Sequence, residues 1–145
     1  MILYAESSAV LRWLFNDALA DQVFDELIGA RKVVCSRLTL IECRRAVRRA
    51  LSESRIAETQ LSEVLSVLAQ STARWAVLEL TPDVAERASG RFPVEPVRTL
   101  DAIHLASMAI LRESLPDLVV LSTDTRLREN SAQLGFELRP EGLAA

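Results

Sequence analysis

The chain has 145 residues, of which 50% are hydrophobic and 26% are charged, and its net charge at pH 7 is −3. This length and composition predict a single globular domain that buries roughly two-thirds of the surface of its unfolded chain, and they exclude a disordered or fibrous protein. The small negative charge excludes a general attraction to nucleic acid, so any contact with RNA has to come from a local basic patch.

The first predicted element is a buried strand at Met1–Ala5, which ends at an acid and two serines. A helical pattern of apolar residues follows over Ala9–Leu14. Glu6 has two interpretations at this position. It is either a carboxylate that faces a site at the end of the strand, or an acid that favours the N-terminus of the helix, with Ser7 or Ser8 as the N-cap.

The spacing of apolar residues then predicts a helix over Ala18–Ala30, a short strand over Lys32–Cys35 and a helix from Leu38 to about Leu51. Glu42 falls in the second turn of the last of these helices, near the end of the preceding strand. It either points back to the same edge of the sheet as Glu6 or is a surface glutamate paired with an arginine.

The helix over Leu38–Leu51 also carries a stripe of arginines, which consists of Arg44, Arg45, Arg48 and Arg49. Because arginine forks suit phosphate oxygens, the stripe is one of three things: a surface for an RNA backbone, a solvated helix face, or a docking surface for an acidic partner. The candidates for contact with RNA or a partner are Arg37, Arg44, Arg45, Arg48 and Arg98.

The longest helical pattern runs over Arg55–Ala73 and is predicted to pair with the preceding helix as a hairpin, leaving part of its apolar face for another chain. The elements predicted next are a strand over Trp75–Leu80, a helix from Pro82 to about Gly90 and a loop over Phe92–Val97. The last segment is a loop because its prolines remove backbone donors and restrict the residues before them.

A helix with Thr99 as its predicted N-cap follows the loop, and it is apolar almost all round, which predicts that it is buried. Asp101 in its first turn is either an acid stabilised by the helix dipole or a charge that something positive binds. His104 is three residues further on, within reach of a hydrogen bond to Asp101. A single histidine in an apolar helix is more often a core residue than a base or a ligand.

The run Leu118–Leu121 is apolar without alternation, which is typical of a strand in the middle of a parallel sheet. Ser122 and Thr123 are predicted to cap the next helix, which Gly135 ends. Asp124 therefore lies at the carboxyl end of a central strand, the edge of a parallel sheet at which ligands bind.

Four acids share positions at strand ends or in early helical turns: Glu6, Glu42, Asp101 and Asp124. If they cluster, their carboxylates repel one another and raise at least one pKa unless a divalent cation neutralises them. Oxygen ligands without a thiol or imidazole cluster favour Mg²⁺ or Mn²⁺. The chemistry indicated is metal-assisted hydrolysis of a phosphodiester.

Four segments resemble, in order and over nearly the whole chain, the motifs of PIN domains, and within that family those of the VapC toxins of bacterial toxin–antitoxin pairs. They are Leu3–Val10 (LYAESSAV), Ser36–Glu42 (SRLTLIE), Leu100–Ala106 (LDAIHLA) and Ser122–Leu127 (STDTRL). The resemblance implies a single domain over residues 1–145, with a three-layer α/β/α sandwich around a central parallel sheet. It also implies Mg²⁺- or Mn²⁺-dependent endoribonuclease activity, a homodimer, and inhibition by a VapB-like antitoxin.

By position, the resemblance assigns Glu42, Asp101 and Asp124 to a metal site, Ser8 to a hydroxyl beside the metal, and Thr123 to a role in holding metal-bound water. Glu6 departs from the pattern, because the family usually has aspartate there. The glutamate side chain is longer by one C–C bond, or roughly 1.5 Å. We expect Glu6 to face the metal directly or through water.

Other classes of protein fit less well. A phosphoacceptor receiver domain also gathers acids at strand ends, but its pattern includes a lysine late in the chain. The only lysine of this chain is Lys32. The glycines form neither GxGxxG nor a P-loop, which disfavours a nucleotide-binding Rossmann domain. The alternative that stays open is a PIN-like module that binds RNA or an antitoxin without cleaving. The few aromatic residues leave the RNA target unspecified.

The remaining features concern cysteines and membranes. Cys35 and Cys43 form no CxxC pair and there is one histidine, so we expect two reduced, buried thiols and no zinc site. No apolar run approaches the roughly 20 residues of a membrane span, and the N-terminus lacks a cleavable signal. We expect a cytoplasmic protein without membrane contact.

Overall fold

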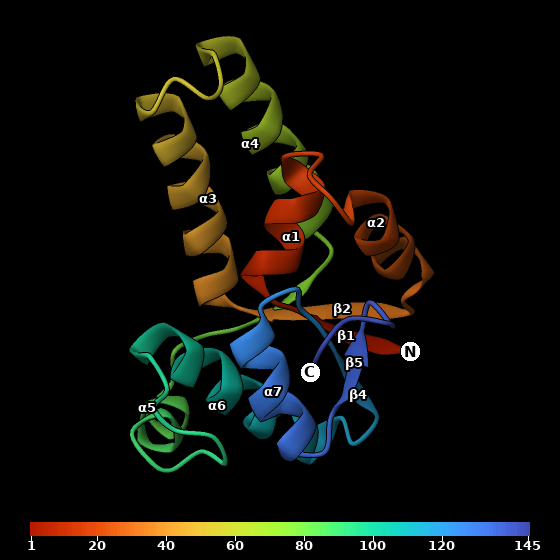
Figure 1. Ribbon diagram of the computed structural model, residues 1–145, viewed down its shortest axis with the longest axis vertical. Coiled ribbons are helices and arrows are strands. Elements are labelled where there is room, and N and C mark those ends of the chain that lie inside the picture. Colours follow the sequence, from red (N-terminus) through yellow and green to blue (C-terminus); the bar gives the residue numbers. More distant parts are fainter.

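A five-stranded parallel sheet forms the centre of the computed structural model, which describes all 145 residues (Figure 1). The strands are β1 (Ile2–Ala5), β2 (Lys32–Ser36), β3 (Ala76–Leu78), β4 (Leu118–Leu121) and β5 (Glu137–Arg139). Their order across the sheet is β3-β2-β1-β4-β5, and all four pairings are parallel. The predicted α/β class with a central parallel sheet is confirmed.

Helices cover both faces of the sheet. They are α1 (Ser7–Leu14), α2 (Ala20–Gly29), α3 (Arg37–Ser52), α4 (Glu58–Thr72), α5 (Pro82–Ala88), α6 (Thr99–Ser114) and α7 (Thr125–Gln133). Figure 1 shows α1 to α4 on one side of the sheet and α5 to α7 on the other, which completes the predicted three-layer sandwich.

The central strands β1 and β4 are buried on both faces, as their unbroken apolar runs predict. Successive side chains of a strand point to opposite faces, and β1 follows this rule. Tyr4 packs with Leu105 and Met108 of α6 in the larger core cluster. Leu3 packs with Val23 of α2 on the opposite face. Because β1 contributes to both cores, its carboxyl end is held firmly in place.

The predicted hairpin of α3 and α4 is confirmed, and Figure 1 shows it extending away from the sheet. It carries apolar side chains that no other part of the chain covers. Ile41 on α3 is 49% exposed and Val67 on α4 is 44% exposed. That another chain covers part of the apolar face of α4 stays a prediction.

Two predicted helix caps are wrong. Arg98, not Thr99, is the N-cap residue of α6, and it makes no capping hydrogen bond through its side chain. At α7 the cap is Asp124, whose Oδ1 accepts from the backbone N–H of Leu127 at 2.9 Å. Ser122 and Thr123 were predicted for that role, but neither is the N-cap residue, and the Ser122 hydroxyl donates to Glu6 at 2.7 Å.

At α1 the cap is Glu6 itself, which accepts from the backbone N–H of Ser8 at 3.1 Å. Neither Ser7 nor Ser8 caps this helix, because both hydroxyls donate to carboxylates of the site. The strand β5 was also not predicted. It has three residues, two of them charged, and lies at the edge of the sheet, so it lacks the apolar run that marks β1 and β4.

Both cysteines are free and buried, as predicted. Burial raises the pKa of the Cys35 thiol to about 12, so this thiol stays protonated and unreactive at neutral pH. No helix combines the length and the apolar character that a membrane crossing requires.

Arg128 fastens the C-terminal tail to the sheet. Its side chain is buried, with 3% of its surface exposed, and it has no acidic partner. It donates instead to five backbone carbonyls, those of Ser122, Arg139, Pro140, Leu143 and Ala144. The bond to Ser122, at 2.9 Å, holds the segment that leads from β4 to Asp124.

We predict that Arg128→Met lowers the free energy of unfolding by about 3 kcal/mol, because it leaves several buried carbonyls without a donor. Urea denaturation of the two proteins measures the difference. The matched control is Arg126→Met on the same helix, since Arg126 is exposed and its replacement costs less than about 0.5 kcal/mol. Equal losses in the two variants would contradict the structural role of Arg128.

Candidate functional site

A groove opens at the carboxyl ends of the central strands, where the N-termini of α1, α3, α6 and α7 meet. Its volume is about 670 Å³. All four predicted acids line it: Glu6, Glu42, Asp101 and Asp124. They come from segments far apart in the sequence, and the parallel sheet brings them together because its strands all end at the same edge.

Glu6 is the most buried of these acids, with 5% of its surface exposed. Its Oε2 accepts from the hydroxyls of Ser8 and Ser122, and its Oε1 accepts from the backbone N–H of Ser8. Burial raises the pKa of this carboxyl, while the nearby His104 and the hydrogen bonds from Ser8 and Ser122 lower it in part. Both oxygens of Glu6 are therefore engaged by groups of the protein.

The same hydroxyls hold the loop that carries Asp124. Ser8 Oγ accepts from the backbone N–H of Thr123 at 2.9 Å, and Ser122 Oγ accepts from that of Asp124 at 3.1 Å. Glu6 thus orients two serines, and the serines orient the start of α7. Ser122 was not among the predicted site residues. Its place beside Thr123 and Asp124 in the STD motif was the available signal.

Glu42 is held through one oxygen only. Its Oε1 accepts from Ser7 Oγ at 2.6 Å and lies 2.6 Å from His104 Nε2. The expected hydrogen bond between His104 and Asp101 is absent, because the buried imidazole points from α6 toward β1 and α3, where Tyr4 and Glu42 stand. Sequence reasoning missed Ser7 and Tyr4, whose partners are remote in the chain.

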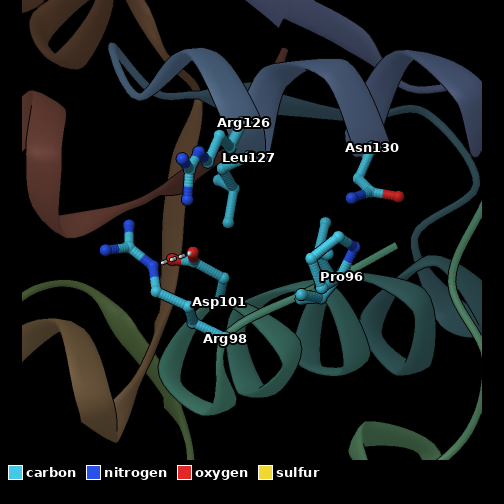
Figure 2. A pocket seen from close by; sticks show the side chains of 8 residues that line it. Pro96, Arg98, Asp101, Arg126, Leu127 and Asn130 are labelled. Carbon is cyan, nitrogen blue, oxygen red and sulfur yellow. Dashed lines mark ion pairs between the residues drawn. The ribbon is translucent and has the colours of Figure 1, made fainter. Parts of the chain in front are cut away.

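Asp101 and Asp124 form the other side of the groove. Burial and the neighbouring charge of Asp124 raise the pKa of Asp101, and Arg98 lowers it in part from 3.4 Å. Figure 2 shows Arg98 and Arg126 approaching Asp101 from α6 and α7. The repulsion between the two aspartates is a cost that a cation in the groove would remove.

The acids suit a hard divalent cation in chemistry and in location. All are carboxylates, the thiols are buried elsewhere in the core, and the imidazole of His104 is engaged by Tyr4 and Glu42. No three acidic, histidine or cysteine side chains stand close enough together to form a ready ligand set. Asp101, Asp124 and Glu42 would hold such a cation once their side chains turned toward it.

Only some of the arginines predicted to contact RNA or a partner line the groove. Arg45 and Arg98 line the groove, and so does Arg49, but Arg44 and Arg48 do not. Arg37 is occupied by Glu79, to which its Nε donates at 2.8 and 2.9 Å. The groove therefore combines a row of carboxylates with basic side chains on its rim, which is an arrangement suited to a phosphate backbone.

The family profile of the PIN domain matches residues 3–132. Ribonuclease VapC35 of Mycobacterium tuberculosis is 30% identical to this chain over an alignment of 147 positions, which covers 99% of each chain.

Solved structures agree on the fold. VapC20 of M. tuberculosis, described as a toxin that cleaves the sarcin-ricin loop, superposes with a TM-score of 0.64 at 16% identity, covering 92% of this chain and 95% of the other. VapBC2 of Rickettsia felis, solved with a DNA fragment from its promoter, has a TM-score of 0.64 at 11% identity, covering 96% and 98%.

We predict that Asp101→Asn raises the free energy of unfolding at pH 7.5 when divalent cations are absent. Because the pKa of Asp101 is raised in the folded state, its ionised form destabilises the fold. This destabilisation is complete at pH values above the pKa of the folded state and absent at pH values below the pKa of Asp101 in the unfolded chain. The gain therefore shrinks as the pH falls toward 4. Urea denaturation at both pH values measures it.

The control for this prediction is Asp117→Asn, which replaces an exposed aspartate outside the groove and should change stability little at either pH. If Asp101→Asn gave the same gain at pH 4 as at pH 7.5, ionisation of Asp101 would not be the cause.

Proposed function

Because the chain belongs to the PIN-domain family and matches VapC ribonucleases over its whole length, we propose that it is a metal-dependent endoribonuclease, the toxin of a type II toxin–antitoxin pair. The observation that carries the proposal is the groove at the ends of the central strands, which four carboxylates line. This arrangement gives the fold a place where a phosphodiester and a divalent cation can meet.

Hydrolysis of a phosphodiester requires an activated water and a neutralised phosphate, and a bound Mg²⁺ or Mn²⁺ supplies both. The residues proposed to hold the ion are Asp101, Asp124 and Glu42. In each of them one carboxylate oxygen contacts a group of the protein. Asp101 pairs with Arg98, and Asp124 accepts from the backbone N–H of Leu127. Glu42 is held by Ser7 and His104. The other oxygen of each has no protein donor.

Glu6 differs from the other acids, and we assign it an indirect part. Its Oε2 accepts from two serine hydroxyls and its Oε1 from a backbone N–H, so it supplies negative charge at the floor of the groove and orients Ser8 and Ser122. Ser8 is proposed as a hydroxyl beside the ion, and Thr123 as a group that holds metal-bound water.

The substrate contacts are proposed for the arginines on the rim. Arg45 and Arg49 lie one helical turn apart on α3 and line the groove together with Arg98. Guanidinium groups bind phosphate oxygens in a bidentate way and carry no base specificity by themselves. This surface would hold an RNA backbone across the acids.

The proposed partners are a VapB-like antitoxin and a second copy of the chain, with action in the cytoplasm. Exposed apolar residues support a protein partner. On α2, Phe24 is 43% exposed and Ile28 is 65% exposed. Both line a second groove of about 430 Å³ together with Trp13 and Trp75. Side chains of this kind are enriched in the cores of protein interfaces.

The rival function is a PIN-like module that binds RNA or an antitoxin without cleaving it. One observation favours it: position 6, where the resemblance to PIN domains implies aspartate, holds a glutamate whose carboxylate is engaged by serines. The same assay distinguishes the two functions.

We predict that the purified chain cleaves RNA in the presence of Mn²⁺ and that Asp101→Asn lowers the rate at least about 100-fold, because the variant loses a charged ligand. Cleavage of a pool of structured cellular RNAs, followed by gel electrophoresis and sequencing of the ends, measures it. Addition of a chelator should stop the reaction. Equal cleavage by the wild type, the variant and the chelated sample would show contamination, and binding without cleavage would favour the rival.

We predict that the double variant Arg45→Gln/Arg49→Gln binds RNA more weakly and with a weaker dependence on salt than the wild type does. Each lost phosphate contact reduces the slope of log K against log salt by about 0.7 for a single strand. Fluorescence anisotropy at several salt concentrations measures both quantities.

The matched control for this pair is Arg44→Gln/Arg48→Gln, which removes the same charge from the same helix but outside the groove. If both double variants lost equal affinity, long-range charge rather than contact in the groove would explain the binding.

A further inference from the structure

A chain of hydrogen bonds runs from the core to the groove through the only histidine. The Tyr4 hydroxyl lies 2.7 Å from His104 Nδ1, and His104 Nε2 lies 2.6 Å from Glu42 Oε1. Ser7 Oγ donates to the same oxygen of Glu42. These residues belong to β1, α6, α3 and α1, so the chain links four elements of the fold.

The direction of each bond follows from the acceptors. Ser7 Oγ donates to Glu42 Oε1, so this oxygen is an acceptor, and His104 Nε2 lies 2.6 Å from the same oxygen as its second donor. Burial raises the pKa of Tyr4, whose hydroxyl therefore keeps its proton and can donate to Nδ1. The Nε2–H tautomer, in which Nδ1 accepts from Tyr4 and Nε2 donates to Glu42, satisfies all three groups.

His104 itself is screened from the groove. It is 1% exposed, and its ring packs edge-on against Tyr4 at a centroid distance of 6.0 Å and an angle of 84°. It does not line the groove, whereas the side chain of Glu42 does and is 27% exposed. Any influence of the histidine on a ligand in the groove therefore passes through Glu42.

The arrangement is asymmetric at the carboxylate. Both hydrogen bonds reach Oε1, and no group of the protein donates to Oε2. Fixing one oxygen restricts rotation of the side chain, which leaves the other oxygen in a defined position. Partners behind a ligand set orient it in this way, and their removal typically costs 10- to 100-fold in metal affinity or activity.

We propose that His104 is a positioning residue: in its Nε2–H tautomer, selected by Tyr4, it holds Oε1 of Glu42 so that Oε2 is presented to the groove. The proposal rests on the proposed function for the identity of the ligand, a divalent cation, but its geometry stands independently. It assigns a task to a histidine that, as an ordinary core residue, would only fill space.

The first test compares two amide replacements of His104. The amide of glutamine stands about where Nε2 stands and can donate to Glu42, whereas that of asparagine stands about where Nδ1 stands and reaches only Tyr4. We expect His104→Asn to weaken Mn²⁺ binding, measured by titration calorimetry, about 10-fold or more. His104→Gln should stay within about threefold of the wild type. Urea denaturation of both variants accounts for changes in stability.

The second test shows whether the histidine acts through Glu42. If it does, His104→Asn causes little further loss of Mn²⁺ affinity or kcat when Glu42→Gln is already present, because the group that it positions is gone. In the wild-type background it should lower kcat and leave the KM for RNA nearly unchanged. The proposal would be overturned if the losses of Mn²⁺ affinity or kcat from His104→Asn and Glu42→Gln multiplied in the double variant. It would also be overturned if His104→Asn and His104→Gln lost the same affinity.

The third test needs neither metal nor RNA. Since the chain has one histidine, ¹⁵N NMR of the imidazole gives one pair of signals without assignment. We expect the Nε2–H tautomer in the wild type and a mixture of tautomers in Tyr4→Phe. An Nδ1–H tautomer in the wild type would overturn the proposal even if a variant failed to fold. Absence of RNA cleavage by the wild type would refute the proposed function and leave this result unaffected.

Discussion

The structure depends on the parallel packing of β1 between β2 and β4. The register pairs Ile2 with both Lys32 and Leu118, so the three strands end at one level. The Glu6 N–H continues the ladder by donating to Leu121 O at 3.0 Å. Because each of these strands is followed by a helix N-terminus, polar side chains from distant segments emerge at the same edge. The acids therefore gather at the groove because the buried apolar strands place them there, against their mutual repulsion.

The acids are held in place in four different ways. Serine hydroxyls engage Glu6, a histidine and a serine engage Glu42, a backbone N–H engages Asp124, and an arginine lies beside Asp101. Burial of these carboxylates costs stability and raises the pKa of Glu6 and of Asp101, and the charge of Asp124 raises the pKa of Asp101 further. Sites that bind or react commonly retain such unfavourable interactions, because relieving them would remove the function.

Glu6 acts on the groove through its hydrogen-bond partners. Its carboxylate accepts hydrogen bonds from serine hydroxyls and caps α1. Through Ser122 it also holds the loop before α7. The negative charge stays at the end of the strand, but it acts on the groove through hydroxyl groups. The rest of the acidic set keeps an oxygen free of protein donors at each carboxylate.

The sequence by itself determined the order of the elements from β1 to α7 and the edge at which the four acids gather, because apolar periodicity and strand-to-helix order depend on residues that are close in the chain. Only the tertiary structure decided the partners. Ser122 reaches Glu6 across 116 positions, and His104 bonds to Glu42 across 62 positions rather than to the nearby Asp101. Packing also decided which arginines of α3 face the groove. Contacts between remote segments depend on how whole layers dock, and local patterns carry no record of that.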